Sequence, residues 1–189
     1  MVAATKIVVQ ALQWQSHVPM FPLHELRQNR AHAGVSMQNY SQPVVFRSQH
    51  KPRFFEIDPY GHLSMVHYAA YFVEHRFQGM AQHCGLNAEA LAELDIAFFC
   101  ANLNIEFKRP VLLDTEFTIE SHIASYRGST ASVRCSMYDL GGKLLACCHM
   151  EIACVDIKRG RPKRLPDSLI KCFFHDASAD NHQGVAFSA

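Results

Sequence analysis

Residues 56–85 read EIDPYGHLSMVHYAAYFVEHRFQGMAQHCG, a turn followed by the longest helix that the sequence predicts. Asp58 and Gly61 are typical turn residues. After them, apolar residues recur at spacings of three and four, which predicts an amphipathic helix with its apolar stripe on the core and polar residues such as His75 on other faces. Gly85 is a natural C-terminal stop. The expected stripe consists of Val66, Ala69, Ala70, Val73, Phe77, Met80, Ala81 and Cys84.

The segments on either side of this helix predict an antiparallel sheet. Residues 44–55 are extended in character, and Asn87 is a good N-cap for a second, shorter helix that ends near Leu94. Beyond Asp95 the apolar period changes to two, and turn signals separate the resulting half-buried strands. The order strand, long helix, four strands predicts an α+β fold in which the helix covers one face of the sheet. The four strands are expected at residues 103–107, 117–123, 131–137 and 144–157.

Composition and charge limit the partners that the protein can have. The chain has 189 residues, which is room for one domain with appendages, and 49% of them are hydrophobic. Its 18 Lys plus Arg balance 17 Asp plus Glu, which excludes a broadly basic nucleic-acid surface. No apolar run reaches the roughly 18 residues of a membrane span, and no signal peptide is recognisable. We therefore expect a cytoplasmic protein that binds neither nucleic acid nor membranes.

The two ends of the chain differ in composition from the middle. Residues 1–43 lack a sustained period of 2 or 3.6, so we expect a loosely ordered extension there. Residues 175–189 are polar and small, which is typical of a flexible tail. The predicted domain therefore covers residues 44–174. We also hypothesise that Met37 is the biological start of the chain.

No metal site or disulfide framework is predicted. The chain has 7 Cys and 12 His, but it has no CxxC pair and no histidine spacing typical of a metal site. Most of the cysteines alternate with apolar neighbours in strand-like runs, which is typical of reduced core residues. We expect the protein to need no metal ion and no other cofactor.

Residues 53–76, RFFEIDPYGHLSMVHYAAYFVEHR, resemble the acyl-CoA thioesterases of the hotdog fold, in particular the 4-hydroxybenzoyl-CoA thioesterase-like branch. The shared features are a strand, an Asp, a short Gly-containing loop and a helix that opens toward a Tyr and a Glu-x-x-Arg-like end. Residues 104–110, NIEFKRP, followed by Asp114, and residues 160–169, GRPKRLPDSL, are similar to two later and less specific segments. Together the resemblance covers about residues 44–169.

The resemblance implies an antiparallel sheet wrapped around one long central helix. It also implies a homodimer or homotetramer with active sites between subunits, and hydrolysis of an acyl-CoA to a free acid and CoA. Two alternatives stay open, a non-catalytic acyl-CoA-binding protein of the same fold and a hydratase or dehydratase. The absence of the motif typical of the hydratases argues against the last of these.

By position in the motif, the resemblance implies that Asp58 is the catalytic carboxylate, either as nucleophile on the thioester carbonyl or as general base for water. The backbone N–H groups of Met65 and Val66, at the helix N-terminus, are the candidate oxyanion donors. The residues alone support this, because a carboxylate ahead of a helix lies close to unpaired N–H dipoles and Gly61 allows close approach to the backbone. An Asx turn in which Asp58 only holds its own loop is an equal alternative.

Further candidates lie close to Asp58 in sequence. His62 is a candidate for orienting Asp58 or the substrate, with a packing role as its alternative. Ser64 is expected to cap the helix and to supply the polar group that Met65 lacks, because many relatives carry polar side chains at these two positions. Glu74 is a second candidate carboxylate, with a solvated or ion-paired helix residue as the favoured alternative.

Substrate contacts are predicted from the chemistry of coenzyme A, whose phosphates call for basic residues. The candidates near strand ends are Lys108, Arg109 and Arg127, together with Arg134 and Lys143. Tyr68 is a candidate for shaping the acyl pocket. The basic run at residues 158–164 is either a phosphate site or, as we favour, a solvated turn.

Overall fold

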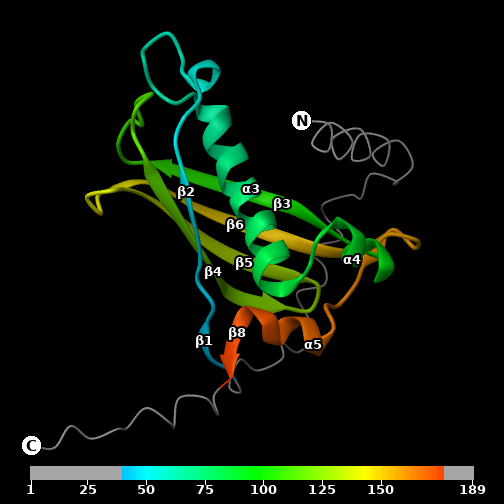
Figure 1. Ribbon diagram of the computed structural model, residues 1–189. Coiled ribbons are helices and arrows are strands. Elements are labelled where there is room, and N and C mark those ends of the chain that lie inside the picture. Colours follow the sequence, from blue (N-terminus) through cyan, green and yellow to red (C-terminus); the bar gives the residue numbers. More distant parts are fainter. Residues whose placement is uncertain (1–39, 177–189) are drawn as a thin grey trace, which may run out of the picture.

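The computed structural model describes residues 40–176, which form one long helix against a curled antiparallel sheet (Figure 1). Met37 and most of the two predicted appendages lie outside these residues and stay predictions. The elements are, in order, β1 (Tyr40–Pro43), β2 (Phe46–His50), η3 (Phe54–Glu56), α3 (Met65–Cys84), α4 (Ala88–Glu93), β3 (Ile96–Phe107), β4 (Phe117–Arg127), β5 (Thr130–Asp139), β6 (Leu144–Asp156), β7 (Arg161–Pro162), α5 (Asp167–Ile170), η4 (Lys171–Phe173) and β8 (Phe174–Asp176).

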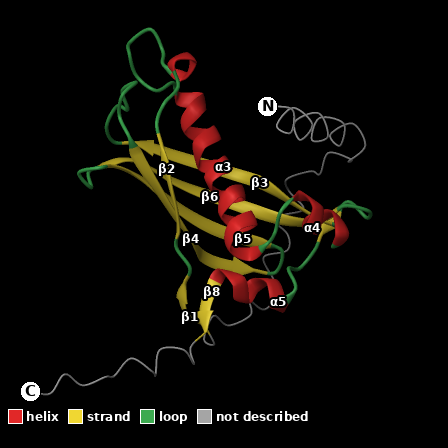
Figure 2. Cartoon of the chain, in the orientation of Figure 1, coloured by secondary structure: helices red, strands yellow, loops and turns green. Residues whose placement is uncertain are grey.

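The predicted α+β fold is confirmed: α3 lies across one face of a sheet whose long strands are all antiparallel (Figure 2). The strand order is β2-β4-β5-β6-β3, so β2 and β3 form the two edges. The short β7 pairs with the end of β6. A separate two-stranded sheet of β1 and β8 joins the two ends of the described chain.

Local signals set the helix boundaries where the sequence predicts them. Ser64 occupies the N-cap position of α3, and Gly85 ends it in the left-handed conformation with a φ of 65°. The side chain of Asn87 accepts a hydrogen bond from the Ala90 N–H and so caps α4. β3 begins at Ile96, seven residues earlier than the alternation predicts, because residues 96–100 pair with the end of β6 without alternating in polarity.

The face of α3 that packs on the sheet is not the predicted apolar stripe. Val66 and Phe77 are 64% and 38% exposed, whereas His75 and Arg76 are only 1% and 2% exposed. Of the predicted stripe only Met80 is fully buried. The prediction was wrong because hydropathy alone cannot show that a polar side chain has partners inside the protein. The residues of α3 that are buried are Tyr68, Tyr71, Phe72, His75, Arg76, Gly79 and Met80.

Hydrogen bonds to two serines explain how His75 can face the sheet. Its Nδ1 lies 2.5 Å from the hydroxyl oxygen of Ser48 on β2, and its Nε2 lies 2.9 Å from that of Ser121 on β4. Burial, with the nearby charges of His50 and Arg76, lowers the pKa of His75 to about 4, so the ring is neutral at pH 7.

The seven cysteines carry no disulfide. Cys135, Cys148 and Cys154 are buried, as expected of core residues, whereas Cys100 is exposed. Within residues 40–176 no helix is long and apolar enough to cross a membrane.

Candidate functional site

The turn that carries Asp58 lies directly ahead of α3 and is tightly hydrogen bonded. Asp58 Oδ1 accepts hydrogen bonds from the N–H groups of Tyr60 (2.9 Å) and His62 (3.2 Å). Its backbone N–H donates to the carbonyl oxygen of His62 at 2.8 Å. Gly61 has a φ of 79°, a conformation that other residues adopt at a cost. The Asx turn that the sequence left open is therefore present, and it fixes the orientation of the carboxylate.

Two further hydrogen bonds attach this turn to the rest of the fold. The Leu63 N–H donates to the carbonyl oxygen of Val111 at 2.7 Å, and the Ser64 N–H donates to that of Glu56 at 2.8 Å. An isolated bridge between His62 and Leu112 adds a contact to the same β3–β4 connection. The position of Asp58 relative to α3 is therefore set by the backbone.

The beginning of α3 offers unpaired N–H groups beside this turn. Ser64 holds the predicted N-cap position, but its hydroxyl does not make the capping hydrogen bond that was expected of it. The His67 N–H donates to the carbonyl oxygen of Ser64, and within residues 40–176 the N–H groups of Met65 and Val66 have no acceptor. The Met65 and Val66 side chains are 68% and 64% exposed, so the first turn of the helix is accessible in the single chain.

Glu56 and Tyr71 are residues of this region that the sequence analysis did not single out. The Tyr71 hydroxyl lies 2.6 Å from Glu56 Oε2 and 3.2 Å from the carbonyl oxygen of Lys51. Glu56 is buried, and its carboxylate also accepts a hydrogen bond from the Arg53 N–H at 2.8 Å. Burial raises the pKa of Tyr71, and the hydrogen bond to Glu56 raises it further. The only feature of the sequence that could have pointed to this pair is the acidic residue Glu56, two positions ahead of Asp58.

Tyr68, a predicted substrate contact, lies one helical turn into α3 and faces the sheet. It is 3% exposed and packs edge-on against Phe107 at the end of β3, with 5.0 Å between the ring centroids. Burial raises the pKa of Tyr68, and the negative charge of Asp58 raises it further. The two side chains therefore lie close enough to interact electrostatically. The structure thus brings Tyr68 together with the Asp58 turn.

The predicted basic contacts fall at opposite ends of the sheet. Lys108 and Arg109 follow β3 at the end of the sheet that carries the Asp58 turn. Lys108 forms an ion pair with Glu106 (2.7 Å), and Arg109 Nη1 donates to the carbonyl oxygen of Leu144. Arg127 ends β4 in the hairpin at the other end, near α5, so one chain does not bring it to Asp58 (Figure 1).

The two other candidate sites, the basic run at 158–164 and Glu74, make ion pairs or hydrogen bonds with nearby side chains of the chain. In the basic run at 158–164, Lys158 pairs with Asp95 at 2.7 Å and Arg164 with Asp167 at 3.3 Å, which favours the solvated turn over a phosphate site. Glu74 is exposed on α3 and accepts a hydrogen bond from Gln78 one turn later. Across residues 40–176, no group of three or more His, Cys, Asp or Glu is arranged to hold a metal ion.

Comparison with known proteins identifies the family. Residues 52–173 match the family described as the thioesterase-like superfamily, a match over more than half of the chain. The chain belongs to this superfamily. Within the thioesterase-like superfamily it is 27% identical to the acyl-CoA thioester hydrolase YbgC of Escherichia coli over 111 residues, which are 58% of this chain and 83% of YbgC. It is 24% identical to the long-chain acyl-CoA thioesterase FadM of E. coli over 65% of this chain and 92% of FadM.

Solved structures of other proteins agree on the fold. A hypothetical protein of Staphylococcus aureus, solved in complex with CoA, superimposes with a TM-score of 0.65 at 16% identity, covering 71% of this chain and 84% of that protein. The predicted hotdog fold is thereby confirmed, with α3 as the central helix. The chain is a thioesterase-like protein homologous, at modest identity, to acyl-CoA thioester hydrolases.

Proposed function

We propose that this protein hydrolyses an acyl-CoA thioester to a free acid and CoA, with Asp58 as the catalytic carboxylate. The observation that carries the proposal is the position of Asp58: two N–H groups of its own turn hold Oδ1, and the next residues form a helix N-terminus with unpaired N–H groups. Oδ1 is fixed while Oδ2 accepts no hydrogen bond within residues 40–176. A carboxylate of this kind is positioned to act on water or on a carbonyl carbon.

The reaction needs a negative charge to be stabilised on the thioester oxygen. The N–H groups of Met65 and Val66, with the positive end of the helix dipole, form the oxyanion site in this proposal. As general base, Asp58 takes a proton from water while the water oxygen attacks the carbonyl carbon. As nucleophile it forms a mixed anhydride that water then opens. In both routes the C–S bond breaks and the thiolate leaves as CoA, and no metal or cofactor takes part.

We place the working site at an interface between copies of the chain, as a homodimer or a higher homo-oligomer. β3 is a 12-residue edge strand that has no pairing partner on its outer side within residues 40–176, and proteins usually cover edges of this length. Apolar residues on the outer face of α3, among them Val66 and Phe77, are exposed in the single chain. A second copy would cover both. Light scattering on a size-exclusion column should give a mass of at least two chains; a monomer at micromolar concentration would contradict the proposal.

The acyl-CoA panel is the experiment that tests the function. Acyl-CoAs of short, long and aromatic type are incubated with the protein, and substrate, free CoA and free acid are separated by chromatography. Chromatography is preferred to a thiol reagent because Cys100 is exposed and would react. Equal amounts of CoA and acid support hydrolysis. A product that keeps its thioester indicates a hydratase, and tight binding without turnover indicates the non-catalytic alternative, which the apolar Met65 at the helix start makes worth testing.

A further inference from the structure

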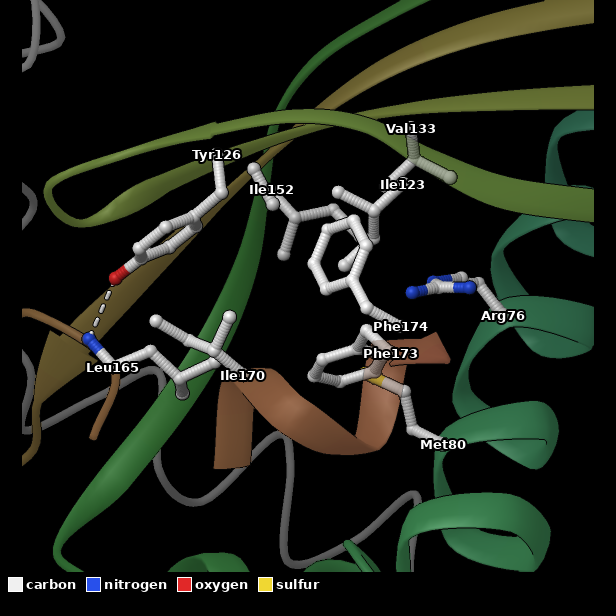
Figure 3. Close-up of a pocket in the computed structure, with 11 residues that line it drawn as sticks. Arg76, Met80, Ile123, Tyr126, Val133, Ile152, Leu165, Ile170, Phe173 and Phe174 are labelled. Atoms are coloured by element: carbon white, nitrogen blue, oxygen red, sulfur yellow. Dashed lines mark hydrogen bonds between the residues drawn. The ribbon is translucent and has the colours of Figure 1, made fainter. Parts of the chain in front are cut away.

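A small cavity lies at the far end of α3 from Asp58, between the helix, the sheet and the C-terminal segment of residues 165–174 (Figure 3). Its volume is about 20 Å³. A cavity of about 10–15 Å³ is enough to hold one water molecule. The cavity therefore accommodates a single small species and no organic molecule. Its lining consists of Arg76, Met80, Ile123, Tyr126, Ala131, Val133, Ile152, Leu165, Ile170, Phe173 and Phe174.

Arg76 is the single charged residue of this lining. It is 2% exposed, and its guanidinium is packed against two aromatic rings, with 4.4 Å from its central carbon to the centroid of Phe46 and 5.3 Å to that of Phe173. Nη1 lies 3.5 Å from the Ser121 hydroxyl oxygen, the limit of a hydrogen bond, and Nε has no partner within residues 40–176. In Figure 3 the guanidinium points toward Phe173 and Phe174.

The charge of this guanidinium is not balanced inside the described chain. Within residues 40–176 no carboxylate lies within 4 Å of its nitrogens. Burial lowers the pKa of Arg76 to about 10, so the group is still charged at pH 7. Its neighbour His75 is neutral there, and burial raises the pKa of the Cys84 thiol to about 12, so neither supplies a negative charge. A buried charge is costly unless it is paired.

We propose that the cavity binds one small monovalent anion of the halide type, held by the guanidinium of Arg76. A guanidinium offers only donors, and a halide only accepts. Water fits less well, because it needs two to four polar partners and has protons to donate. The other polar side chain of the lining, Tyr126, is engaged: its hydroxyl oxygen accepts a hydrogen bond from the Leu165 N–H at 2.7 Å. The cavity volume of about 20 Å³ favours a halide over free phosphate or carboxylic acid anions, which are larger.

The anion would also connect two parts of the fold. Phe173 and Phe174, in the C-terminal segment, line the same cavity as Arg76 and Met80 of α3. An ion between them links this segment to the helix, so its binding should stabilise the folded protein by mass action.

Crystals of the full chain grown in sodium bromide test the proposal directly, because bromide scatters anomalously. The expected result is an anomalous peak in contact with the Arg76 guanidinium. The proposal would be overturned if the cavity were empty, or if it held a water molecule without anomalous signal or a side-chain oxygen of the chain.

Thermal unfolding tests it in solution. At constant ionic strength, sodium gluconate, whose anion is too large for the cavity, is replaced by sodium chloride. The Tm should rise by roughly 2–5 °C for each tenfold increase in chloride above the dissociation constant. Equal Tm values in the two salts contradict the proposal.

Variants test whether the chloride-dependent rise in Tm depends on Arg76. Arg76→Met should abolish the chloride dependence, and Arg134→Met, at an exposed arginine of β5, should keep it. Should Arg76→Met fail to fold, Val133→Ile fills part of the cavity, leaves Arg76 in place and should reduce the chloride-dependent shift. If the chloride-dependent shift in Tm were the same in Arg76→Met or Val133→Ile as in the wild type, chloride would act at a site other than this cavity, and the proposal would be overturned.

Discussion

The hydroxyl of Tyr71 lies 2.6 Å from the carboxylate of Glu56, and this contact ties the middle of α3 to the turn ahead of it. Glu56 also receives the Arg53 N–H on its side chain and the Ser64 N–H on its backbone carbonyl. Glu56 therefore accepts three hydrogen bonds, two of them on its buried carboxylate, and Asp58 follows it by two residues. The proposed catalytic turn is rigid because a buried polar pair anchors it.

Removing the Tyr71 hydroxyl should destabilise the protein. Tyr71→Phe leaves a buried carboxylate with one partner fewer, which costs about 1–3 kcal/mol in the free energy of unfolding, measured by urea titration. Hydrolysis should slow as well, because the turn that orients Asp58 loses an anchor. Tyr60→Phe is the control, since Tyr60 is 85% exposed and its change should alter stability by less than about 0.5 kcal/mol. Equal stability of the two variants would show that the contact contributes nothing.

Asp58→Asn should keep the fold and lose catalysis. The amide oxygen can still accept the hydrogen bonds from Tyr60 and His62, but the group can neither take a proton nor attack a carbonyl carbon. We expect kcat/KM for the best acyl-CoA to fall by about 10²-fold or more. Asp139→Asn is the matched control, because Asp139 also accepts a turn hydrogen bond, from the Lys143 N–H at 2.8 Å, with no helix N-terminus following it. Near-normal turnover in Asp58→Asn would refute the catalytic assignment.

Gly79→Ala should destabilise the protein although alanine favours helices. A Cβ at Gly79 would lie 2.3 Å from the ring of Phe46 on β2, which is far inside van der Waals contact. Overpacking of this kind costs about 1–3 kcal/mol, more than the roughly 1 kcal/mol that alanine gains over glycine in a helix. Gly141→Ala, whose Cβ would come no nearer than 3.3 Å to Asp139 Oδ1, is the control in denaturant unfolding. A stabilised Gly79→Ala would mean that α3 and β2 pack less closely.

Stability should decrease below pH 6.5 because of His75. Its pKa is about 4 in the folded protein against 6.5 for an ordinary histidine, so between these values the unfolded chain binds the extra proton. The free energy of unfolding should therefore fall by about 1–3 kcal/mol as the pH drops from 7 to 4.5, and it should not change through this group above pH 7. Burial also lowers the pKa of His50, which adds in the same direction.

His75→Gln isolates this contribution. Glutamine keeps hydrogen-bonding capacity toward Ser48 and Ser121 but does not titrate, so the difference in unfolding free energy between wild type and variant should narrow as the pH falls. His122→Gln, at a half-buried position on β4, should leave the slope of the wild type unchanged. An identical pH dependence for wild type and His75→Gln would assign the acid sensitivity to other groups.

The candidate site was predictable only where neighbouring residues build it. The turn at Asp58, the N-cap position of Ser64 and the stop at Gly85 depend on residues adjacent in sequence, and all three are found where the sequence places them. Glu56 was missed because its partner, Tyr71, lies 15 residues away on the helix. Arg127 ends β4 far from Asp58 within one chain. This was not predictable, because the sequence alone does not show how β4 runs relative to the helix.

The sequence by itself determined the order of elements, the α+β class and the antiparallel strands, because period, turn residues and caps act over a few neighbouring residues. Only the tertiary structure decided which face of α3 is buried. Hydropathy favoured Val66 and Phe77. The sheet, however, supplies serines of β2 and β4 as hydrogen-bond partners for His75, and Arg76 packs against two aromatic rings, one from β2 and one from η4. A polar side chain is buried when distant residues satisfy it, and their proximity exists only in the folded chain.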